Sequence, residues 1–355
     1  MAARALSVYL GREAARQISR EGWSADLFSQ LLGASGGPKW FILAQLDRLV
    51  FGDFLQRSER PLSVLGSSIG TWRHACLAQP DPAAAIARLE AAYLHQHYAT
   101  RPTAAEVSAV SLGILQGVLG ENGAGTLINH PRIHSHIVTA RGRGPSGTTS
   151  TPLLVTGMGA AALGNAVSRR LLSAHFQRVV FHSGAGPNAG LDFHDFNTRY
   201  CSLDESNVLT ALRASGAIPF VLTGERDISG APPGQYWDGG IIDYHFDLNQ
   251  YCGEGLILYP HFSPSVVPGW FDKFLPWRQA AIHHVDKLVL LCPSREFTAA
   301  LPLGKIPDRS DFTALPHAER VGYWQACVAS GQALAEEFWE LLQGGDPLRG
   351  ATVLA

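Results

Sequence analysis

Charged residues are scarce in this 355-residue sequence, at 16% of the chain, and they nearly cancel to a formal net charge of −2. This balance gives no global basic field, so the composition argues against the usual electrostatic basis of nucleic-acid binding. Apolar residues, by contrast, make up 46% of the chain. The combination indicates a globular protein with a sizeable core, built as one large α/β domain or as two smaller ones.

Cysteine is also sparse: the five residues are scattered, odd in number and without C-x-x-C spacing. That pattern favours reduced thiols in a cytosolic setting over a disulfide framework or a zinc site. Residues 1–20 carry charges throughout and lack the apolar segment of a secretory signal. No apolar run approaches the ~20 residues needed to span a bilayer. We therefore expect a cytoplasmic protein, for which any membrane contact is peripheral.

The stretch 62–72 is the part of the chain around which the other motifs are organised. Four strand-type residues lead into residues 66–70 (GSSIG), a G-x-S-x-G pattern, and a helix-compatible run follows. This is the sequence form of a nucleophile elbow, which holds its central serine, here Ser68, in a sparsely populated backbone conformation. Glycine at 66 and 70 keeps side chains out of the tight turn. Taken alone, the pattern also fits an ordinary Gly/Ser turn between a strand and a helix.

A Gly-rich loop, residues 33–40, lies between a predicted strand and a predicted helix that precede the elbow. The order strand, loop, helix, strand, elbow describes a βαβ unit, in which both strand ends meet at one edge of a parallel sheet. The loop and Ser68 are therefore expected to be neighbours. The backbone N–H groups of Gly36 and Gly37 would then face a developing oxyanion, where the loss of one donor costs ~3 kcal/mol of barrier.

Two phosphate-binding patterns come close to matching the sequence. The Gly-rich loop is not a P-loop, because Pro38 and Trp40 stand where that motif needs glycine and serine or threonine. Residues 157–162 match G-x-G-x-x-A after a possible strand at 153–155. The next strand, 178–181, ends without the acidic residue that a dinucleotide site requires, so we expect a small-residue helix packed on a sheet instead.

His134 and His136 share one face of a predicted strand at 133–140. Because no third ligand is apparent nearby, we interpret them as surface histidines rather than as a metal site. The sequence thus gives no reason to expect a metal or a cofactor.

Asp238 follows a short aromatic strand, residues 235–237, and precedes Gly239 and Gly240. Asp-Gly is a common hairpin turn, so the motif taken alone predicts a turn. A carboxylate partly buried behind aromatic side chains is, however, a stronger base than an exposed one. If the fold brings Asp238 to Ser68, the carboxylate can accept the hydroxyl proton.

The remaining patterns predict further elements by apolar periodicity and turn residues. They comprise a helical lead-in at 1–24, strands at 27–32, 62–65, 198–203, 256–259 and 287–292, and helices at 41–55, 71–78, 81–98, 104–119, 205–214 and 319–342. The apolar helix at 104–119 would line an acyl pocket or simply pack in the core.

Together these pieces resemble the patatin-like phospholipases over about residues 25–245. Residues 34–39 correspond to the oxyanion loop of that family, 66–70 to its elbow and 238–240 to its D-G-[AG] motif, in the family order. The resemblance implies a three-layer α/β/α fold with a mainly parallel central sheet. Residues 246–355 would form a C-terminal extension that completes the same globular unit.

The resemblance also implies a function, that of a serine acyl hydrolase of the lipase or phospholipase A type. Ser68 would be the nucleophile and Asp238 its base, in a dyad without a catalytic histidine, with Gly36 and Gly37 as the oxyanion hole. Supporting roles would fall to Lys39, Gly66, Gly70 and Gly239. The expected partner is a lipid or another acyl-ester substrate, with no nucleic acid; the oligomeric state does not follow from the sequence.

The sequence departs from the family pattern in the oxyanion loop. Ala34 and Ser35 stand in place of the usual Asp-Gly, and Lys39 replaces arginine, which keeps the charge but loses the planar guanidinium. Two alternatives remain open. One is an α/β-hydrolase-type esterase with a Ser-His-Asp triad, in which His245 or His261 follows the acid. The other is a catalytically silent relative that binds lipid or protein.

Overall fold

The structure is a computed structural model that describes residues 4–98, 101–184, 186, 190, 192–278, 282 and 285–354. Its strands are β1 (Leu6–Leu10), β2 (Phe28–Gly33), β3 (Leu62–Ser67), β4 (Ile133–Gly142), β5 (Phe176–His182), β6 (Thr198–Ser202), β7 (Glu225–Arg226), β8 (Gln235–Asp238), β9 (Leu256–Pro260), β10 (Leu288–Pro293) and β11 (Ala351–Val353). Its helices are α1 (Arg12–Glu21), α2 (Ala44–Gly52), α3 (Ile69–Leu77), α4 (Pro82–Leu94), α5 (Ala104–Leu119), α6 (Gly123–Ile128), α7 (Thr151–Val167), α8 (Val208–Ser215), α9 (Arg295–Ala300), α10 (Asp311–Ala314), α11 (His317–Ser330) and α12 (Gln332–Leu342).

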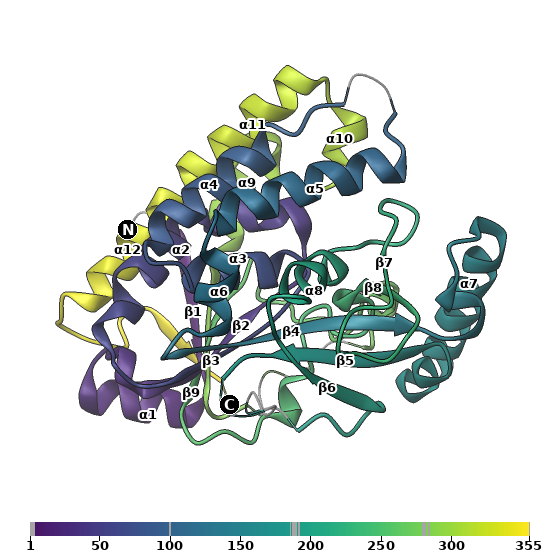
Figure 1. Cartoon of the computed structure of the whole chain (residues 1–355). Helices are drawn as coiled ribbons and strands as arrows, with labels where there is room; N and C mark the ends of the chain where they lie inside the picture. Colours follow the sequence, from purple (N-terminus) through teal and green to yellow (C-terminus); the bar gives the residue numbers. More distant parts are fainter. Residues whose placement is uncertain are drawn as a thin grey trace.

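The strands form one mixed sheet in the order β11-β1-β10-β9-β2-β3-β4-β5-β6, to which β8 adds beside β4 and β7 beside β8 (Figure 1). The middle of the sheet, from β10 to β4, is parallel throughout. Strands β9 and β10 read as nearly continuous apolar runs, and every one of their residues is buried. That pattern is expected where helices cover both faces of a parallel sheet.

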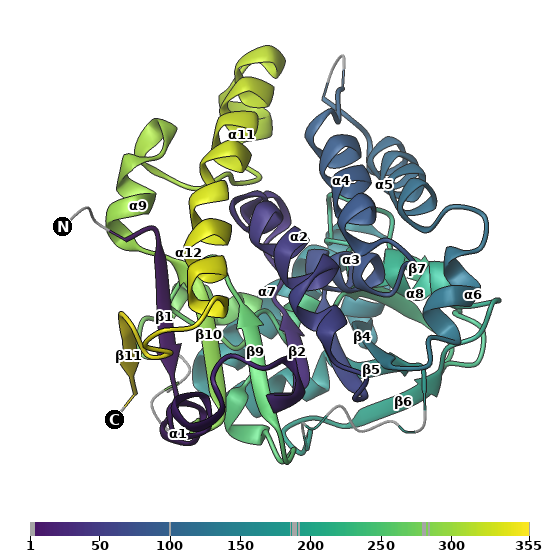
Figure 2. The same ribbon diagram turned by 90° about the vertical axis from the view of Figure 1, so that its left-hand side faces the viewer.

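Helices pack on both faces of the sheet. Helix α3 contacts β2, β3 and β4, and α2, α4 and α12 extend the same layer. Helix α7 lies on the opposite side, behind the sheet in Figure 2, where Leu154, Met158 and Ala161 join a second core cluster with Trp237. The predicted three-layer α/β/α arrangement around a mainly parallel sheet is thus confirmed. None of the described helices combines the length and apolarity needed to cross a bilayer.

Segments far apart in the sequence are neighbours in this sheet. Strand β9 pairs with β2, while β10 pairs with both β9 and β1. At the edge, β11 pairs with β1, which brings the two ends of the chain to the same side of the molecule (Figure 2). Residues 246–355 therefore supply strands to the sheet that also contains the elbow.

Three sequence predictions are wrong in detail. The expected helical lead-in at 1–24 contains β1 before α1, because Leu6–Leu10 pairs with β10, a partner that no local pattern reveals. The expected strand at 153–155 lies inside α7, where Pro152 occupies the first turn and a buried stripe recurs every three or four residues. The single helix expected at 319–342 is two helices that meet at Gly331, whose added Cβ would lie 2.6 Å from the carbonyl oxygen of Ile42.

Candidate active site

The turn at Ser68 has the geometry of a nucleophile elbow. Strand β3 ends at Ser67, α3 begins at Ile69, and Ser68 between them has φ 54° and ψ −130°. A non-glycine residue with positive φ is uncommon and strained, and such residues persist where the surrounding structure holds them. The predicted strained conformation is therefore present, and it places Ser68 directly before the N-terminus of a helix.

The glycines of the motif are required by close packing. A Cβ at Gly70 would lie 2.0 Å from the carbonyl oxygen of Gly33, and one at Gly66 would lie 2.8 Å from the amide nitrogen of Thr71. Strand β2 pairs with β3 in parallel, with Gly33 opposite Gly66, so the Gly-rich loop and the elbow leave the sheet side by side. The adjacency predicted from the βαβ order is thus observed.

The side chains of Ser68 and Asp238 meet. Ser68 Oγ donates a hydrogen bond to Asp238 Oδ2 at 2.7 Å, and the N–H of Gly240 donates to Asp238 Oδ1, also at 2.7 Å. Asp238 is 6% exposed at the end of β8, where the preceding Tyr236 and Trp237 are buried. Burial raises the pKa of Asp238 to about 6, against the lowering effect of these two hydrogen bonds. A carboxylate with a raised pKa is a stronger base than an exposed one, and here it lies within hydrogen-bond distance of the Ser68 hydroxyl.

Ser215 holds the backbone of the elbow, a role that the sequence did not reveal. The N–H of Ser68 donates to Ser215 Oγ at 3.0 Å, and Ser215 Oγ donates to the carbonyl oxygen of Val138 in β4 at 2.7 Å. Directly after it, the carbonyl of Ala217 accepts from the N–H of Asp238 at 2.9 Å. In the structure, the segment 215–219 therefore connects Ser68 to Asp238.

A chain of hydrogen bonds fixes the Gly-rich loop to the same assembly. Ser35 Oγ and Ser67 Oγ are 2.7 Å apart, and Ser67 Oγ donates to the carbonyl oxygen of Asp243 at 2.6 Å. The Asp243 carboxylate is held in turn by a buried, bidentate pair with Arg178 on β5, at 2.6 and 2.8 Å. Ser35, which departs from the family pattern, therefore has a structural role in which its hydroxyl connects the loop to the elbow.

The loop glycines lie where an oxyanion hole is expected. Gly36 and Gly37 line the same cavity as Ser68 and Asp238. Within the part of the chain that the structure describes, neither of their N–H groups donates a hydrogen bond to a protein acceptor. Both donors therefore remain available to a ligand in the cavity. Gly239, the other expected supporting glycine, packs so closely that its Cβ would lie 2.2 Å from the carbonyl oxygen of Val138.

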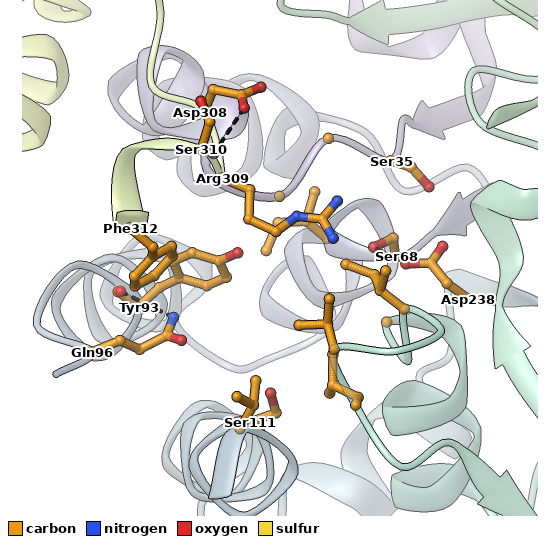
Figure 3. Close-up of a pocket in the computed structure, with 18 of the residues that line it drawn as sticks. Ser35, Ser68, Tyr93, Gln96, Ser111, Asp238, Asp308, Arg309, Ser310 and Phe312 are labelled. Carbon is orange, nitrogen blue, oxygen red and sulfur yellow. Dashed lines mark hydrogen bonds between the residues drawn. The ribbon is translucent and has the colours of Figure 1, made fainter. Parts of the chain in front are cut away.

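The dyad opens into a cavity of about 1010 Å³ (Figure 3). Helix α5 contributes Val107 and Ser111 to its wall, so part of the helix expected at an acyl pocket does reach the cavity. A volume of this size accommodates a lipid-sized ligand. Further parts of the wall come from α4, the segment 216–222 and residues 308–320.

Cationic side chains surround this cavity, and the sequence predicted one of them. Lys39 lines the wall and forms an ion pair with Asp308 at 3.6 Å. Lys273 and Arg309 also line it, and both lower the pKa of Asp238 by their charge. They lie in the region 246–355, outside the motifs that carry the resemblance, and only the tertiary fold brings them to the site.

The histidines of the alternative triad are not bonded to the nucleophile. Nδ1 of His245 accepts from the N–H of Val267 at 3.0 Å, and Nδ1 of His261 accepts from the N–H of Ser263 at 3.0 Å. Neither ring lines the cavity. Burial lowers the pKa of His245 well below its ordinary value and that of His261 to about 3.

The other sequence patterns lie outside the cavity. The G-x-G-x-x-A residues 157–162 lie inside α7 rather than at the turn between a strand and a helix. His136 is buried, not at the surface as expected, and its ring lies 6.2 Å from that of His182. Among the described residues, no group of three or more His, Cys, Asp or Glu side chains is placed to hold a metal ion.

No family model matches the chain, and no curated protein matches it in sequence.

Proposed function

We propose that this protein is a serine acyl hydrolase that cleaves ester bonds of lipids through the dyad of Ser68 and Asp238. The observation that carries the proposal is the 2.7 Å hydrogen bond from Ser68 Oγ to a buried carboxylate, at an elbow that opens into a lipid-sized cavity. The ordered motifs that resemble patatin-like phospholipases support the same assignment. Strain, a perturbed pKa and a large pocket coincide here, which is typical of a catalytic centre.

The reaction proceeds in two halves. Ser68 Oγ forms a bond to the ester carbonyl carbon while Asp238 Oδ2 takes the hydroxyl proton. The oxyanion that forms accepts hydrogen bonds from the N–H groups of Gly36 and Gly37. The alcohol then leaves with the proton from Asp238, and an acyl-enzyme remains on Ser68. A water molecule then gives one proton to Asp238 as its oxygen attacks the acyl carbon. The bond between that carbon and Ser68 Oγ breaks, the proton passes from Asp238 to Ser68 Oγ, and the fatty acid leaves.

A dyad accounts for the site better than a triad does, because Ser68 Oγ already donates to a carboxylate and, among the residues that the structure describes, no histidine is hydrogen-bonded to it. His245→Gln and His261→Gln should therefore retain turnover in protein that remains folded. Loss of turnover in one of these folded variants would favour the triad.

Ser68→Ala should reduce ester hydrolysis by roughly 10⁴-fold or more, because the nucleophile acts as a unit with its base. The measurement is hydrolysis of a panel of p-nitrophenyl esters, glycerides and phospholipids by wild-type and variant protein. Ser206→Ala, which removes an exposed serine outside the cavity, serves as the matched control and should keep wild-type rates.

Full activity in Ser68→Ala would contradict the proposal. Wild-type protein that hydrolyses nothing on the panel, and that binds lipid equally well with Asp238→Asn, would instead identify a catalytically silent lipid-binding protein.

A further inference from the structure

Three cations from three separate segments face the cavity beside the dyad. Lys39 lies in the 3₁₀ segment Gly37–Leu43, which begins within the Gly-rich loop, Lys273 lies in the 3₁₀ segment Trp270–Phe274, and Arg309 precedes α10. Figure 3 shows the Arg309 side chain reaching from that segment toward Ser68 and Asp238. The acyl-transfer steps proposed above use none of the three.

Of these three cations, only Lys39 forms an ion pair with a carboxylate of the described residues. Lys39 pairs with Asp308 at 3.6 Å, and Lys273 Nζ lies 3.5 Å from the centre of the Tyr244 ring. In the described ranges, neither Lys273 nor Arg309 has a carboxylate within ion-pair distance, and the Arg309 guanidinium donates no hydrogen bond to the protein. Its donors therefore remain available to a ligand.

The cations also repel one another. Burial first, and then the charges of Lys39 and Arg309, lower the pKa of Lys273 to about 7, while the charges of Asp238 and Asp308 offset only part of that effect. The charge of Arg309 also acts on Tyr93, whose hydroxyl points into the cavity (Figure 3). Burial raises the pKa of this phenol, so the hydroxyl stays protonated and can donate a hydrogen bond. An anion bound among these groups would relieve the repulsion and would accept hydrogen bonds from each donor.

We propose that Arg309, Lys273 and Tyr93 form an anion-binding subsite beside the dyad, so that the preferred ester carries a phosphate or carboxylate close to its scissile carbonyl. The planar guanidinium suits a bidentate contact with either group. The part of this inference that makes the ligand a hydrolysed ester rests on the proposed function. The anion site itself can be tested without hydrolysis.

The alternative is that Arg309 and Lys273 serve only to keep Asp238 ionised, since both lower its pKa. In that case their removal would raise the pKa of Asp238 and affect every ester alike. A substrate subsite, by contrast, affects only the ester that bears the anion. The experiment therefore compares two esters that differ in that group alone.

The test uses 1-hexanoylglycerol and 1-hexanoylglycerol 3-phosphate as a matched pair. Wild-type protein should show a higher kcat/KM for the phosphorylated ester. Arg309→Gln and Lys273→Gln should each reduce that preference by about tenfold or more, as expected for the loss of a charge-assisted hydrogen bond. Arg170→Gln removes one exposed positive charge outside the cavity and should leave the preference unchanged. Equal losses on both esters in Arg309→Gln and Lys273→Gln, or hydrolysis of both esters by wild-type protein with the same kcat/KM, would overturn the subsite.

Binding measured by calorimetry separates this inference from the proposed function. Ser68→Ala protein should bind the phosphorylated ester more tightly than the neutral one, and the double variant Ser68→Ala/Arg309→Gln should lose about tenfold in affinity for the phosphorylated ester only. That result supports the subsite even if wild-type protein hydrolyses neither ester, in which case the proposed hydrolase alone fails. Equal affinities for the two esters in Ser68→Ala would overturn the subsite while leaving hydrolysis untouched.

Inorganic phosphate distinguishes a headgroup of the substrate from a free anion. If the subsite holds the headgroup, phosphate should compete with the phosphorylated ester and should not alter turnover of the neutral one. If phosphate instead stimulates hydrolysis of the neutral ester, the site holds a free anion, and the assignment to the substrate is overturned.

Discussion

Asp238 is the residue whose surroundings determine how the site responds to pH. A carboxylate exposed to water is a weak base, with a pKa of ~3.9. In the structure the side chain is enclosed at the end of β8, and burial raises its pKa to about 6. Because the group must be ionised to accept the Ser68 proton, activity should rise with pH through that value.

For a neutral ester we expect kcat/KM to fall about tenfold per pH unit below pH ~6 and to level off above it. The measurement is the kcat/KM profile from pH 4.5 to 8 with 1-hexanoylglycerol, which avoids any titration of a charged substrate. A profile that is flat across this range, or that rises toward acid, would contradict the role of Asp238 as a base.

At the scale of elements, the site depends on how closely β2, β3 and α3 approach one another. The contact is closest at Gly70, where a Cβ would lie 2.0 Å from the carbonyl oxygen of Gly33. The backbones of β2 and β3 cannot shift independently to relieve this contact, because the two strands are paired in register up to Gly33 and Gly66. Any side chain at position 70 must therefore separate the loop from the elbow.

Gly70→Ala should lower the free energy of unfolding by about 3 kcal/mol or more and should remove ester hydrolysis. Gly113→Ala is the matched control, because a Cβ at that exposed position in α5 meets nothing within 4 Å. As alanine favours a helix over glycine, this control should be up to ~1 kcal/mol more stable than wild type. Urea denaturation followed by circular dichroism measures both, and a fully stable, active Gly70→Ala would refute the packing argument.

At the scale of the whole molecule, the elbow belongs to a sheet that the span 25–245 cannot complete alone. Strand β2 has β9 as its outer neighbour, and β9 in turn pairs with β10. Without residues 246–355, the buried side chains Leu31 and Leu32 of β2 would lie at an open edge of the sheet. Exposed apolar edges of this kind pair with other chains and aggregate.

A fragment comprising residues 25–245 should therefore be insoluble or unfold without a cooperative transition, whereas the full chain unfolds cooperatively. Solubility and thermal unfolding of the two proteins test this expectation. A soluble fragment with a sharp transition and ester hydrolysis would show that the resemblance covers an independent domain.

Features set by local sequence could be predicted, whereas features set by long-range contacts could not. The elbow, the Gly-rich loop and Asp238 lie in short local motifs, so each can be recognised from neighbouring residues in the sequence. The parallel βαβ order also predicts that the loop lies beside Ser68. Strand β1, Ser215 and the cations Lys273 and Arg309 gain their roles from partners far away in the chain. Pairing at long range leaves no periodic pattern, which is why these features emerge only from the fold.

The central claim is that Asp238 activates Ser68 as a nucleophile, and covalent labelling with a fluorophosphonate tests it most directly. Ser68 Oγ attacks phosphorus, fluoride leaves and the hydroxyl proton passes to the carboxylate. We predict that peptide mapping by mass spectrometry places the adduct on Ser68 in wild-type protein, and that Asp238→Asn labels at least ~10²-fold more slowly while remaining folded. An adduct on a different residue, or labelling of Asp238→Asn at the wild-type rate, would contradict the account.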